Sequence, residues 1–576
     1  MLSYSPPVDD MAFVLFDVFD AEAEWARMPA FGNVDRSLAL AVLREAAKLA
    51  SEAMAPLYQS ADAEGAHWDD GAVRAPRGFN DAFRALAEGG WFGVSGNPEF
   101  GGQGLPKALT GLVEEMFWAA NSNLYLYGAL TTGAATCINA HADPDAKAHY
   151  LPSLYAGKWT GAMALTEAHA GTDLGLMRTR AVPDGQHYAL TGTKVFITSG
   201  EHDLAENIVH LVLAKLPDAP AGTGGISLFI VPKFLPGGGR NRFSSGSIEH
   251  KMGIRGSATS VINYDGATGY LIGEPHKGLR CMFTMMNHAR VSVGIQGLGL
   301  ADLAYQNAAI YAHERLQGRA PTGPMNPDAA ADSILVHPDV RRMLLTQRAF
   351  AEGGRAFAAL VGLLLDQAES AEEPADRQAA QQLVDLLTPV VKAFLTDRGT
   401  EGALLAQQVF GGHGYIVDHG MEQIVRDVRI TQIYEGANGI QALDFAGRKV
   451  LRDGAQTLRL FLDRCRADDV PEEFQEPLGT ALDTIERVAR YLLASAGKNP
   501  DLPGASSADL LELTGLGIYA WLWAKMAGAA SRGDHGASKL AVARFFYAKL
   551  LPKTQALAQN IVNGADPVMA LPESQF

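Results

Sequence analysis

A change of hydrophobic pattern near residue 159 constrains the fold of this 576-residue chain more than any other feature. Before that point apolar residues recur at helical spacing, and after it short segments alternate apolar and polar residues, as half-buried strands do. The helical spacing returns near Met282. The alternating segments are residues 160–165, 187–191, 194–198, 208–213, 225–231 and 260–263, with turns rich in Pro, Asp and Gly between several of them. The sequence therefore predicts a mostly α-helical protein with a central antiparallel β domain.

The same spacing places helices on both sides of the β segment. They are expected at 35–60, 80–88, 107–120, 124–140, 282–319, 339–369, 376–409, 458–466, 477–496, 508–530 and 539–562. A glycine-rich stretch, residues 93–104, is expected to be a loop. These patterns divide the chain into a helical region before about residue 159, a β region, and a second helical region from about residue 282.

Charge and cysteine content limit the classes of partner and site. The chain has 48 basic and 64 acidic residues, and its net charge of −16 opposes a nucleic-acid partner. Cys137, Cys281 and Cys465 are far apart and form no CxxC pair, so we expect buried thiols in a reducing cytosol and no metal site. The most apolar segment, residues 513–524, is too short to cross a bilayer, and the N-terminus lacks the basic region of a signal peptide. A cytoplasmic location without a membrane span is expected.

The segment QIYEGANGIQ, residues 432–441, contains the strongest candidate for catalysis. Glu435 lies between an aromatic residue and a run of small residues, where burial would raise its pKa and suit it to removing a proton from carbon. Gly436, Ala437 and Gly439 leave room for a ligand to approach the backbone. Taken alone, the pattern also describes a helix end with a solvated carboxylate.

Four further motifs precede this segment, and the five together resemble the acyl-CoA dehydrogenase family of FAD enzymes. They are LTEAHAGTD (165–173), GTKVFITSG (192–200), KMGIRGS (251–257) and YAHERLQG (311–318). The resemblance runs from about residue 35 to about residue 453. It implies a helical N-terminal domain (35–158), a β-barrel-like middle domain (159–280) and a C-terminal helical-bundle domain (281–454). A leader (1–34) precedes these domains and a helical C-terminal extension (455–576) follows them. The helical tail and the leader resemble a longer subgroup that includes 3-(methylthio)propanoyl-CoA dehydrogenases.

The resemblance implies a reaction and a base. Family members remove hydrogen from the α and β carbons of an acyl-CoA thioester: a base takes the α proton and the hydride goes to the flavin. Glu435 matches that base, and its own amide would supply half of the oxyanion hole that polarises the thioester carbonyl. Some members carry the base on the helix near Arg290, but the matching residue here is Ala289, which cannot act.

The resemblance also implies how FAD is bound. Thr166 and Thr198 match threonines that hydrogen-bond the isoalloxazine ring. Phe196 stands where many relatives have a tryptophan beside the flavin, and Thr172 replaces a serine. The residues that match those offered to the FAD of a neighbouring subunit are Arg315, Gln408, Gly411 and Gly412, which implies a homodimer or a dimer of dimers. Two departures, Ala437 for threonine and Gly439 for glutamine, remove side chains that touch the cofactor in relatives.

Three functions remain open on the sequence. The first is an acyl-CoA dehydrogenase that passes electrons to an electron-transfer flavoprotein, with 3-(methylthio)propanoyl-CoA or a fatty acyl-CoA as substrate. The second is an acyl-CoA oxidase, in which oxygen reoxidises the flavin. The third is a weakly active flavin-binding scaffold or DNA-associated relative, which Glu435 and the acidic residues between 463 and 476 oppose.

Overall fold

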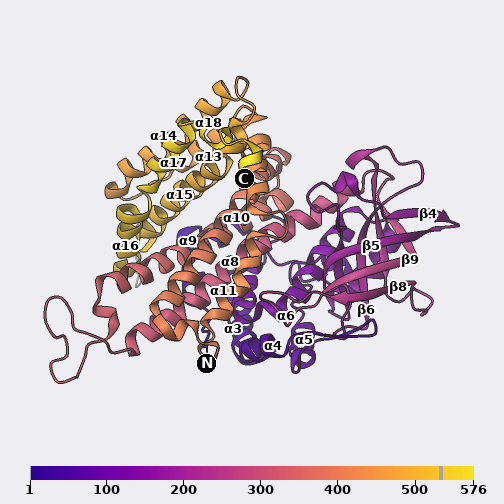
Figure 1. The fold of residues 1–576 in the computed structure, drawn as a ribbon, viewed down its shortest axis with the longest axis horizontal. Helices are drawn as coiled ribbons and strands as arrows, with labels where there is room; N and C mark the ends of the chain where they lie inside the picture. Colours follow the sequence, from indigo (N-terminus) through magenta and orange to yellow (C-terminus); the bar gives the residue numbers. More distant parts are fainter. Residues whose placement is uncertain (1, 531–535) are drawn as a thin grey trace. The chain divides into compact units, whose positions relative to one another are not determined.

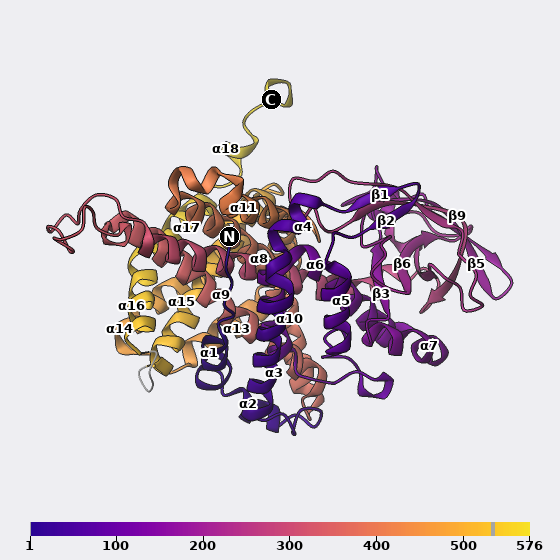
Figure 2. The same cartoon turned by 90° about the horizontal axis from the view of Figure 1, so that it is seen from below.

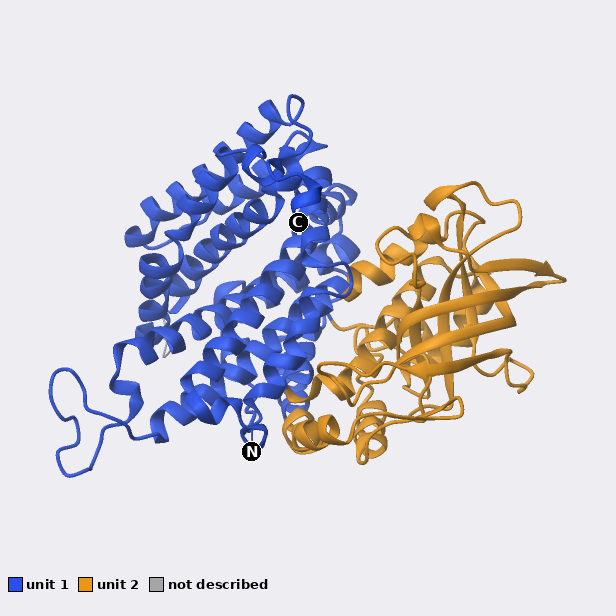
Figure 3. Ribbon diagram, in the orientation of Figure 1, with its two compact units in different colours: residues 1–47, 106–119, 290–576 blue, residues 48–105, 120–289 orange. Residues whose placement is uncertain are grey.

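A computed structural model describes residues 2–530 and 536–576. The chain divides into two compact units (Figure 3). Unit 1 contains residues 1–47, 106–119 and 290–576, and unit 2 contains residues 48–105 and 120–289. Helices α3 (Arg36–Leu49), α6 (Lys107–His141) and α8 (Gly278–Glu314) carry the chain from one unit to the other. The five-part division drawn from the sequence stays a prediction.

Unit 2 is built around a seven-stranded sheet (Figure 1). Its order is β3-β6-β4-β5-β9-β7, β8 pairs with β9, and a further pairing of β6 with β7 closes five of the strands into a ring. This confirms the β-barrel-like middle domain. The strands are β3 (Trp159–Ala164), β4 (Arg180–Asp184), β5 (His187–Thr198), β6 (Asn207–Lys215), β7 (Ile226–Pro232), β8 (Phe243–Ile248) and β9 (Thr259–Ile272).

Two strand pairs depart from the antiparallel arrangement expected for the β domain. Strands β3 and β4 run parallel to β6, whereas the other pairs are antiparallel. Parallel neighbours need a crossover of a dozen or more residues rather than a tight turn. The chain makes such an excursion between β3 and β6, since β4 and β5 intervene. The sheet is therefore mixed.

The helices of unit 2 are α4 (Tyr58–Glu64), α5 (Phe79–Glu88), the second half of α6 and α7 (Pro144–Tyr155), and a small hairpin of β1 (His67–Asp69) and β2 (Ala72–Arg74) follows α4. They follow the predicted spacing in α5 and in the second half of α6, whereas α7 was not expected and α4 lies mostly beyond the helix expected at 35–60. Asn121 interrupts α6 with φ −162° and ψ 88°, which confirms the break expected between residues 120 and 124. Its side-chain oxygen accepts from Leu124 N at 3.1 Å and so caps the second half of the helix.

Unit 1 is helical. Its bundle comprises the second half of α8, α9 (Pro338–Ser370), α10 (Pro374–Val409), α11 (Met421–Arg429) and α12 (Asn438–Leu443). The extension adds α13 (Gln456–Ala467), α14 (Glu472–Ser495), α15 (Leu502–Ala530), α16 (Gly536–Phe545), α17 (Lys553–Val562) and α18 (Asp566–Met569) (Figures 1 and 2). The single helix expected at 539–562 is thus two helices, because Pro552 lacks the N–H that would continue the first.

Helix α15 lies at the centre of the extension and contacts α9, α10, α12, α14, α16 and α17. It is apolar on nearly every side, and its ring donors reach the bundle: Tyr519 Oη donates to Phe350 O at 3.0 Å and Trp523 Nε1 to Ala349 O at 3.2 Å. The apolar residues of the tail therefore pack on the body of unit 1, as expected. Within residues 2–530 and 536–576, no helix combines the length and apolar character needed to span a membrane.

The leader is folded rather than a loose tail. It forms α1 (Val8–Ala12), a π-helical turn (Phe13–Val18) and α2 (Ala21–Ala26). Phe13 and Val14 belong to the main apolar core of unit 1. Asp10 makes ion pairs with Arg355 of α9 and Lys539 of α16, so the first and last parts of the chain meet in one buried charged cluster.

Candidate active site

Glu435 lies in a tight turn between a 3-10 turn (Ile430–Gln432) and α12. Its φ is +56° and that of Gly436 is +86°, so two successive residues adopt left-handed conformations. Such a conformation is uncommon for a residue with a side chain and costs about 1–3 kcal/mol. Gln441 supports the turn, because its Nε2 donates to Glu435 O at 3.2 Å and to Gly436 O at 3.4 Å.

The Glu435 carboxylate is placed to exchange a proton near neutral pH. It is partly buried, and no group in the described part of the chain donates a hydrogen bond to it. Burial raises its pKa to about 7, against the charges of Arg290 and Lys392, which lower it. A base with a pKa near the working pH is effective in proton transfer.

The backbone amide of Glu435 also has no acceptor among the described residues. Next to it, the Tyr434 hydroxyl donates to Gln296 Oε1 of α8 and so fixes the aromatic ring beside the turn. Ala289 is buried on α8 and, as an alanine, carries no group that could serve as a base. A free N–H beside a free carboxylate is the arrangement that a base acting next to a carbonyl group requires.

The residues predicted to hold the flavin ring belong to unit 2. Thr166 follows β3, and its carbonyl accepts from Val195 N of β5 at 2.9 Å, so the two motifs that carry Thr166, Phe196 and Thr198 lie side by side. Phe196 has φ +60° at a shift in the β5–β9 register, and the residue is 62% exposed. An irregularity of this kind re-aims a side chain that a regular strand would bury. Thr172 lies in an exposed loop.

A buried ion pair, which the sequence reasoning missed, fixes these two motifs. Lys194 Nζ lies 3.0 Å from Glu167 Oε1 and donates to Leu165 O at 2.8 Å. The Glu167 carboxylate also accepts from Arg178 N, Thr179 N and Thr179 Oγ1. Burial alone would raise the pKa of Glu167, but Lys194 and these donors outweigh it and hold the pKa at about 2. The sequence could have indicated this pair only through its position: Glu167 follows Thr166, and Lys194 lies two residues before Phe196. Thr166 and Phe196 are both predicted flavin contacts.

The other predicted cofactor residues belong to unit 1. Arg315, Gly411 and Gly412 line a groove of about 410 Å³, whereas Gln408 is exposed on α10 and does not line it. Its other lining residues are Tyr311, Gln317, Ile334, Val409, Phe410 and His413. Of these, Tyr311 stacks on Phe410 at 4.1 Å between ring centroids and hydrogen-bonds His413 Nδ1 at 2.9 Å. Tyr311 belongs to the motif at 311–318, but the resemblance assigned no role to it or to His413.

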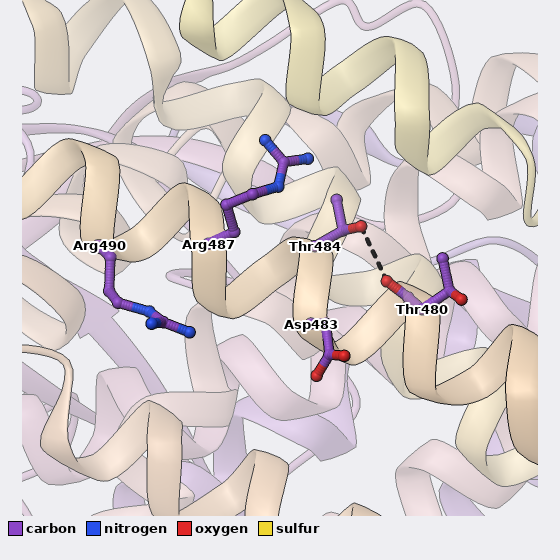
Figure 4. Close-up of a pocket in the computed structure, with 5 residues that line it drawn as sticks. All are labelled: Thr480, Asp483, Thr484, Arg487 and Arg490. Atoms are coloured by element: carbon purple, nitrogen blue, oxygen red, sulfur yellow. Dashed lines mark hydrogen bonds between the residues drawn. The ribbon is translucent and has the colours of Figure 1, made fainter.

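A second hollow, of about 670 Å³, lies on α14 of the extension (Figure 4). The residues that line it are Thr480, Asp483, Thr484, Arg487 and Arg490, all from successive turns of one helix. Its one internal hydrogen bond, from Thr484 Oγ1 to Thr480 O at 2.8 Å, is an ordinary helix contact. The charged side chains are exposed, which is typical of a solvated helix face. Across the described ranges no cluster of His, Cys, Asp and Glu could hold a metal ion.

Family models match nearly the whole chain. Those described as the N-terminal, middle and C-terminal domains of acyl-CoA dehydrogenase match residues 39–158, 162–267 and 276–450. A fourth, described as acetyl-CoA dehydrogenase C-terminal like, matches residues 455–572. The chain thus has the C-terminal extension as well as the three domains of the family.

Relatives and solved structures agree with the family models. The chain is 41% identical to the 3-methylmercaptopropionyl-CoA dehydrogenase of Ruegeria pomeroyi, over 99% of both chains. It is 33% identical to the broad-specificity linear acyl-CoA dehydrogenase FadE5 of Mycobacterium tuberculosis, over the full length of both. The crystal structure of an acyl-CoA dehydrogenase complexed with FAD from Bacillus anthracis has the same fold, with a TM-score of 0.75, 22% identity and coverage of 94% of this chain and 90% of that one. The chain belongs to the acyl-CoA dehydrogenase family.

Proposed function

We propose that this protein oxidises an acyl-CoA thioester to the trans-2-enoyl-CoA, with Glu435 as the base that removes the α proton. The observation that carries the proposal is the Glu435 turn. Its carboxylate has no hydrogen-bond donor among the described residues and a pKa raised to about 7, and its own N–H has no acceptor there. In this proposal the N–H donates to the thioester oxygen, where negative charge develops as the α proton leaves.

The residues of the chain fit FAD as the cofactor, which supplies the hydride acceptor when bound. The exposed ring of Phe196 offers an apolar face, and the hydroxyls of Thr166 and Thr198 lie on the two motifs that Lys194 and Glu167 join. Arg315 brings positive charge to the groove that Gly411 and Gly412 also line. Glycine N–H groups in such a turn can donate to phosphate oxygens. We assign pyrophosphate binding to this groove, and Gln408 and Thr172 to further cofactor contacts.

We propose 3-(methylthio)propanoyl-CoA as the first substrate to test and fatty acyl-CoA thioesters as the second. The 41% identity to a 3-methylmercaptopropionyl-CoA dehydrogenase supports the first, and the 33% identity to a broad-specificity linear acyl-CoA dehydrogenase supports the second. Sulfur in place of one methylene changes the shape of the acyl chain little, and one methylene is worth only about 1–3 kcal/mol in an apolar pocket. One pocket can therefore accept both classes.

The test is anaerobic mixing of the FAD-loaded protein with four thioesters: butanoyl-, octanoyl-, palmitoyl- and 3-(methylthio)propanoyl-CoA. The absorbance of oxidised flavin is followed. Rapid bleaching by one thioester identifies the substrate class, and Glu435→Gln, which keeps the size of the side chain but cannot accept a proton, is expected to slow it at least ~100-fold. If no thioester bleaches a properly bound flavin, the proposal fails and a scaffold role takes its place.

The electron acceptor needs a separate test. We propose an electron-transfer flavoprotein as the acceptor and a homodimer or a dimer of dimers as the assembly. After anaerobic reduction by substrate, the protein is mixed either with an electron-transfer flavoprotein or with air-saturated buffer. Fast reoxidation by the flavoprotein and slow formation of hydrogen peroxide in air support the dehydrogenase. Peroxide formed at the rate of substrate consumption would make the protein an acyl-CoA oxidase instead.

A further inference from the structure

Three polar residues interrupt the apolar middle of α10 beneath the Glu435 turn. Lys392 and Thr396 are buried and Asp397 is partly buried, whereas residues 386–395 are otherwise apolar except for Thr388. Lys392 Nζ makes one hydrogen bond, to Asn438 Oδ1 at 2.7 Å, and makes no ion pair with any residue that the structure describes. A buried ammonium group whose hydrogen-bond acceptor is a neutral amide depends on nearby carboxylates for its charge.

Asn438, the first residue of α12, joins the turn to α10. Its Oδ1 accepts from Lys392, and its Nδ2 lies 2.7 Å from Asp397 Oδ1, 2.9 Å from Thr396 Oγ1 and 3.2 Å from Ala393 O. Both the oxygen and the nitrogen of the Asn438 side-chain amide therefore have hydrogen-bond partners on α10. These hydrogen bonds fix the position of the first residue of α12 relative to α10.

The other end of the turn is tied to the same carboxylate. Gln432 Nε2 donates to Asp397 Oδ1 at 2.6 Å. Gln432 lies three residues before Glu435 and Asn438 three residues after it, so one oxygen atom holds both ends of the turn. A fixed distance between the two ends limits the conformations open to the residues between them. This accounts for a glutamate that persists in the left-handed region despite its cost.

Two cationic side chains act on Glu435, each from a different helix. Arg290 acts on it from α8 and Lys392 from α10, while the phenol of Tyr434 is next to it in the chain. Asp397 acts on Lys392, and Asp444 and Arg448, from the π-helical turn after α12 (Asp444–Leu451), act on Arg290. Burial lowers the pKa of Lys392 to about 7, and the Glu435 carboxylate, followed by Asp397, acts in the opposite direction. Glu435 and Lys392 each favour the charged form of the other.

We propose that Lys392, Asp397 and Asn438 are positioning residues for the base: Asp397 and Asn438 hold the Glu435 turn at both ends, and Lys392, together with Arg290, favours the anionic form of the Glu435 side chain. The inference rests on the proposed function, because it assigns a base whose geometry and charge matter. It adds that α10 contributes to the charge state of the base, alongside Arg290 of α8, through residues that need not touch the substrate.

The charge is tested by following the carboxyl band of Glu435 in pH-difference infrared spectra, assigned by its loss in Glu435→Gln. Lys392→Gln keeps a donor for Asn438 and removes the charge, and Lys392→Met removes both. Both variants are expected to raise the titration midpoint by about one pH unit or more, since a nearby opposite charge lowers a carboxyl pKa by about 1–3 units. Lys392→Arg is expected to keep the wild-type midpoint. The spectrum needs no substrate, so it gives a result even if no thioester is oxidised.

Lys539→Gln is the matched control. Lys539 is also a buried lysine of unit 1, but its partners are Asp10 and Glu352. Its loss is expected to lower Tm and leave the Glu435 midpoint unchanged. If Lys392→Gln and Lys392→Met titrate Glu435 at the wild-type midpoint, Lys392 is only a structural residue and the electrostatic part of the inference is overturned.

The positioning is tested by Gln432→Leu, which removes one tie to Asp397 and leaves every charge in place. We expect the maximal rate of flavin reduction to fall about 10-fold or more, with an unchanged infrared midpoint and an unchanged FAD content. A wild-type rate of flavin reduction in this variant would overturn the role of the Gln432–Asp397 hydrogen bond in positioning the turn. Failure of wild type itself to reduce flavin would instead contradict the proposed function, and the infrared midpoints would still decide the role of Lys392.

Discussion

Glu435 is held in a state that favours chemistry over stability. Folding raises its pKa from the usual 4.5 to about 7, because burial outweighs the attraction of Arg290 and Lys392. A carboxyl group with a raised pKa favours the folded state most at low pH, and that contribution is lost as the pH rises from about 4.5 through about 7. The strained backbone of the residue adds to the cost.

Replacing the base should therefore stabilise the protein at high pH. Glu435→Gln cannot ionise, so we expect its Tm at pH 8 to exceed that of wild type and the difference to disappear at pH 4. Differential scanning calorimetry of both proteins across this range measures it. A variant that is less stable than wild type at pH 8 would show that the carboxylate is well solvated or well paired in the folded protein.

The same group should set the pH dependence of the reaction. Glu435 accepts a proton only as the carboxylate, so the rate of flavin reduction should rise with pH and level off above about 7. Stopped-flow measurements between pH 5.5 and 9 at saturating thioester give the midpoint. A rate that falls over this range would point to a protonated group, rather than Glu435, as the essential one.

At the scale of elements, strands were predicted correctly where apolar and polar side chains alternate. Strands that contain proline or small polar residues were missed. Strands β3, β6 and β7 coincide with expected segments, β5 joins two segments that were expected to be separate, and the segment expected at 260–263 covers only the start of β9. The pattern missed β4, which contains Pro183, and β8, whose middle is Ser244, Ser245, Gly246 and Ser247. Proline lacks a ladder donor and small polar residues carry no hydrophobic signal. Glu435 could be found from a local motif, but Lys392 and Asp397 lie about 40 residues earlier and join it only in the fold.

The Lys194–Glu167 ion pair links β5 to the loop after β3, and we expect it to contribute to the stability of the folded protein. Lys194 is fully buried and Glu167 nearly so, and Lys194→Met leaves a buried carboxylate without its cation. We expect a loss of about 3 kcal/mol in the free energy of unfolding, the lower end of the range for broken buried pairs, since three other donors remain. Urea unfolding measures the loss. Glu167→Gln together with Lys194→Met should recover part of it, whereas a single-variant loss below about 1 kcal/mol would contradict the buried pair.

At the scale of the molecule, the extension is part of the core of unit 1. Side chains of α15 such as Leu516 and Trp523 are buried with α9 and α10 residues such as Phe357 and Phe394. Removing residues 455–576 would expose this apolar surface, and we expect the shortened chain to aggregate when it is expressed. Size-exclusion chromatography checks this. A chain cut after Ala565 is the control, because it loses only exposed residues and should keep the wild-type Tm; a monodisperse, folded product of the larger deletion would contradict the prediction.

The charged cluster of unit 1 also ties folding to the order of synthesis. Asp10 is among the first residues made, yet its partner Lys539 is 529 positions later. At about 5–20 residues per second, a ribosome needs roughly half a minute to two minutes to make that stretch. During this time Phe13 and Val14 have no completed core to enter, which is the condition under which a nascent chain depends on chaperones. The first helix can therefore make its buried contacts only after the last helices have been synthesised.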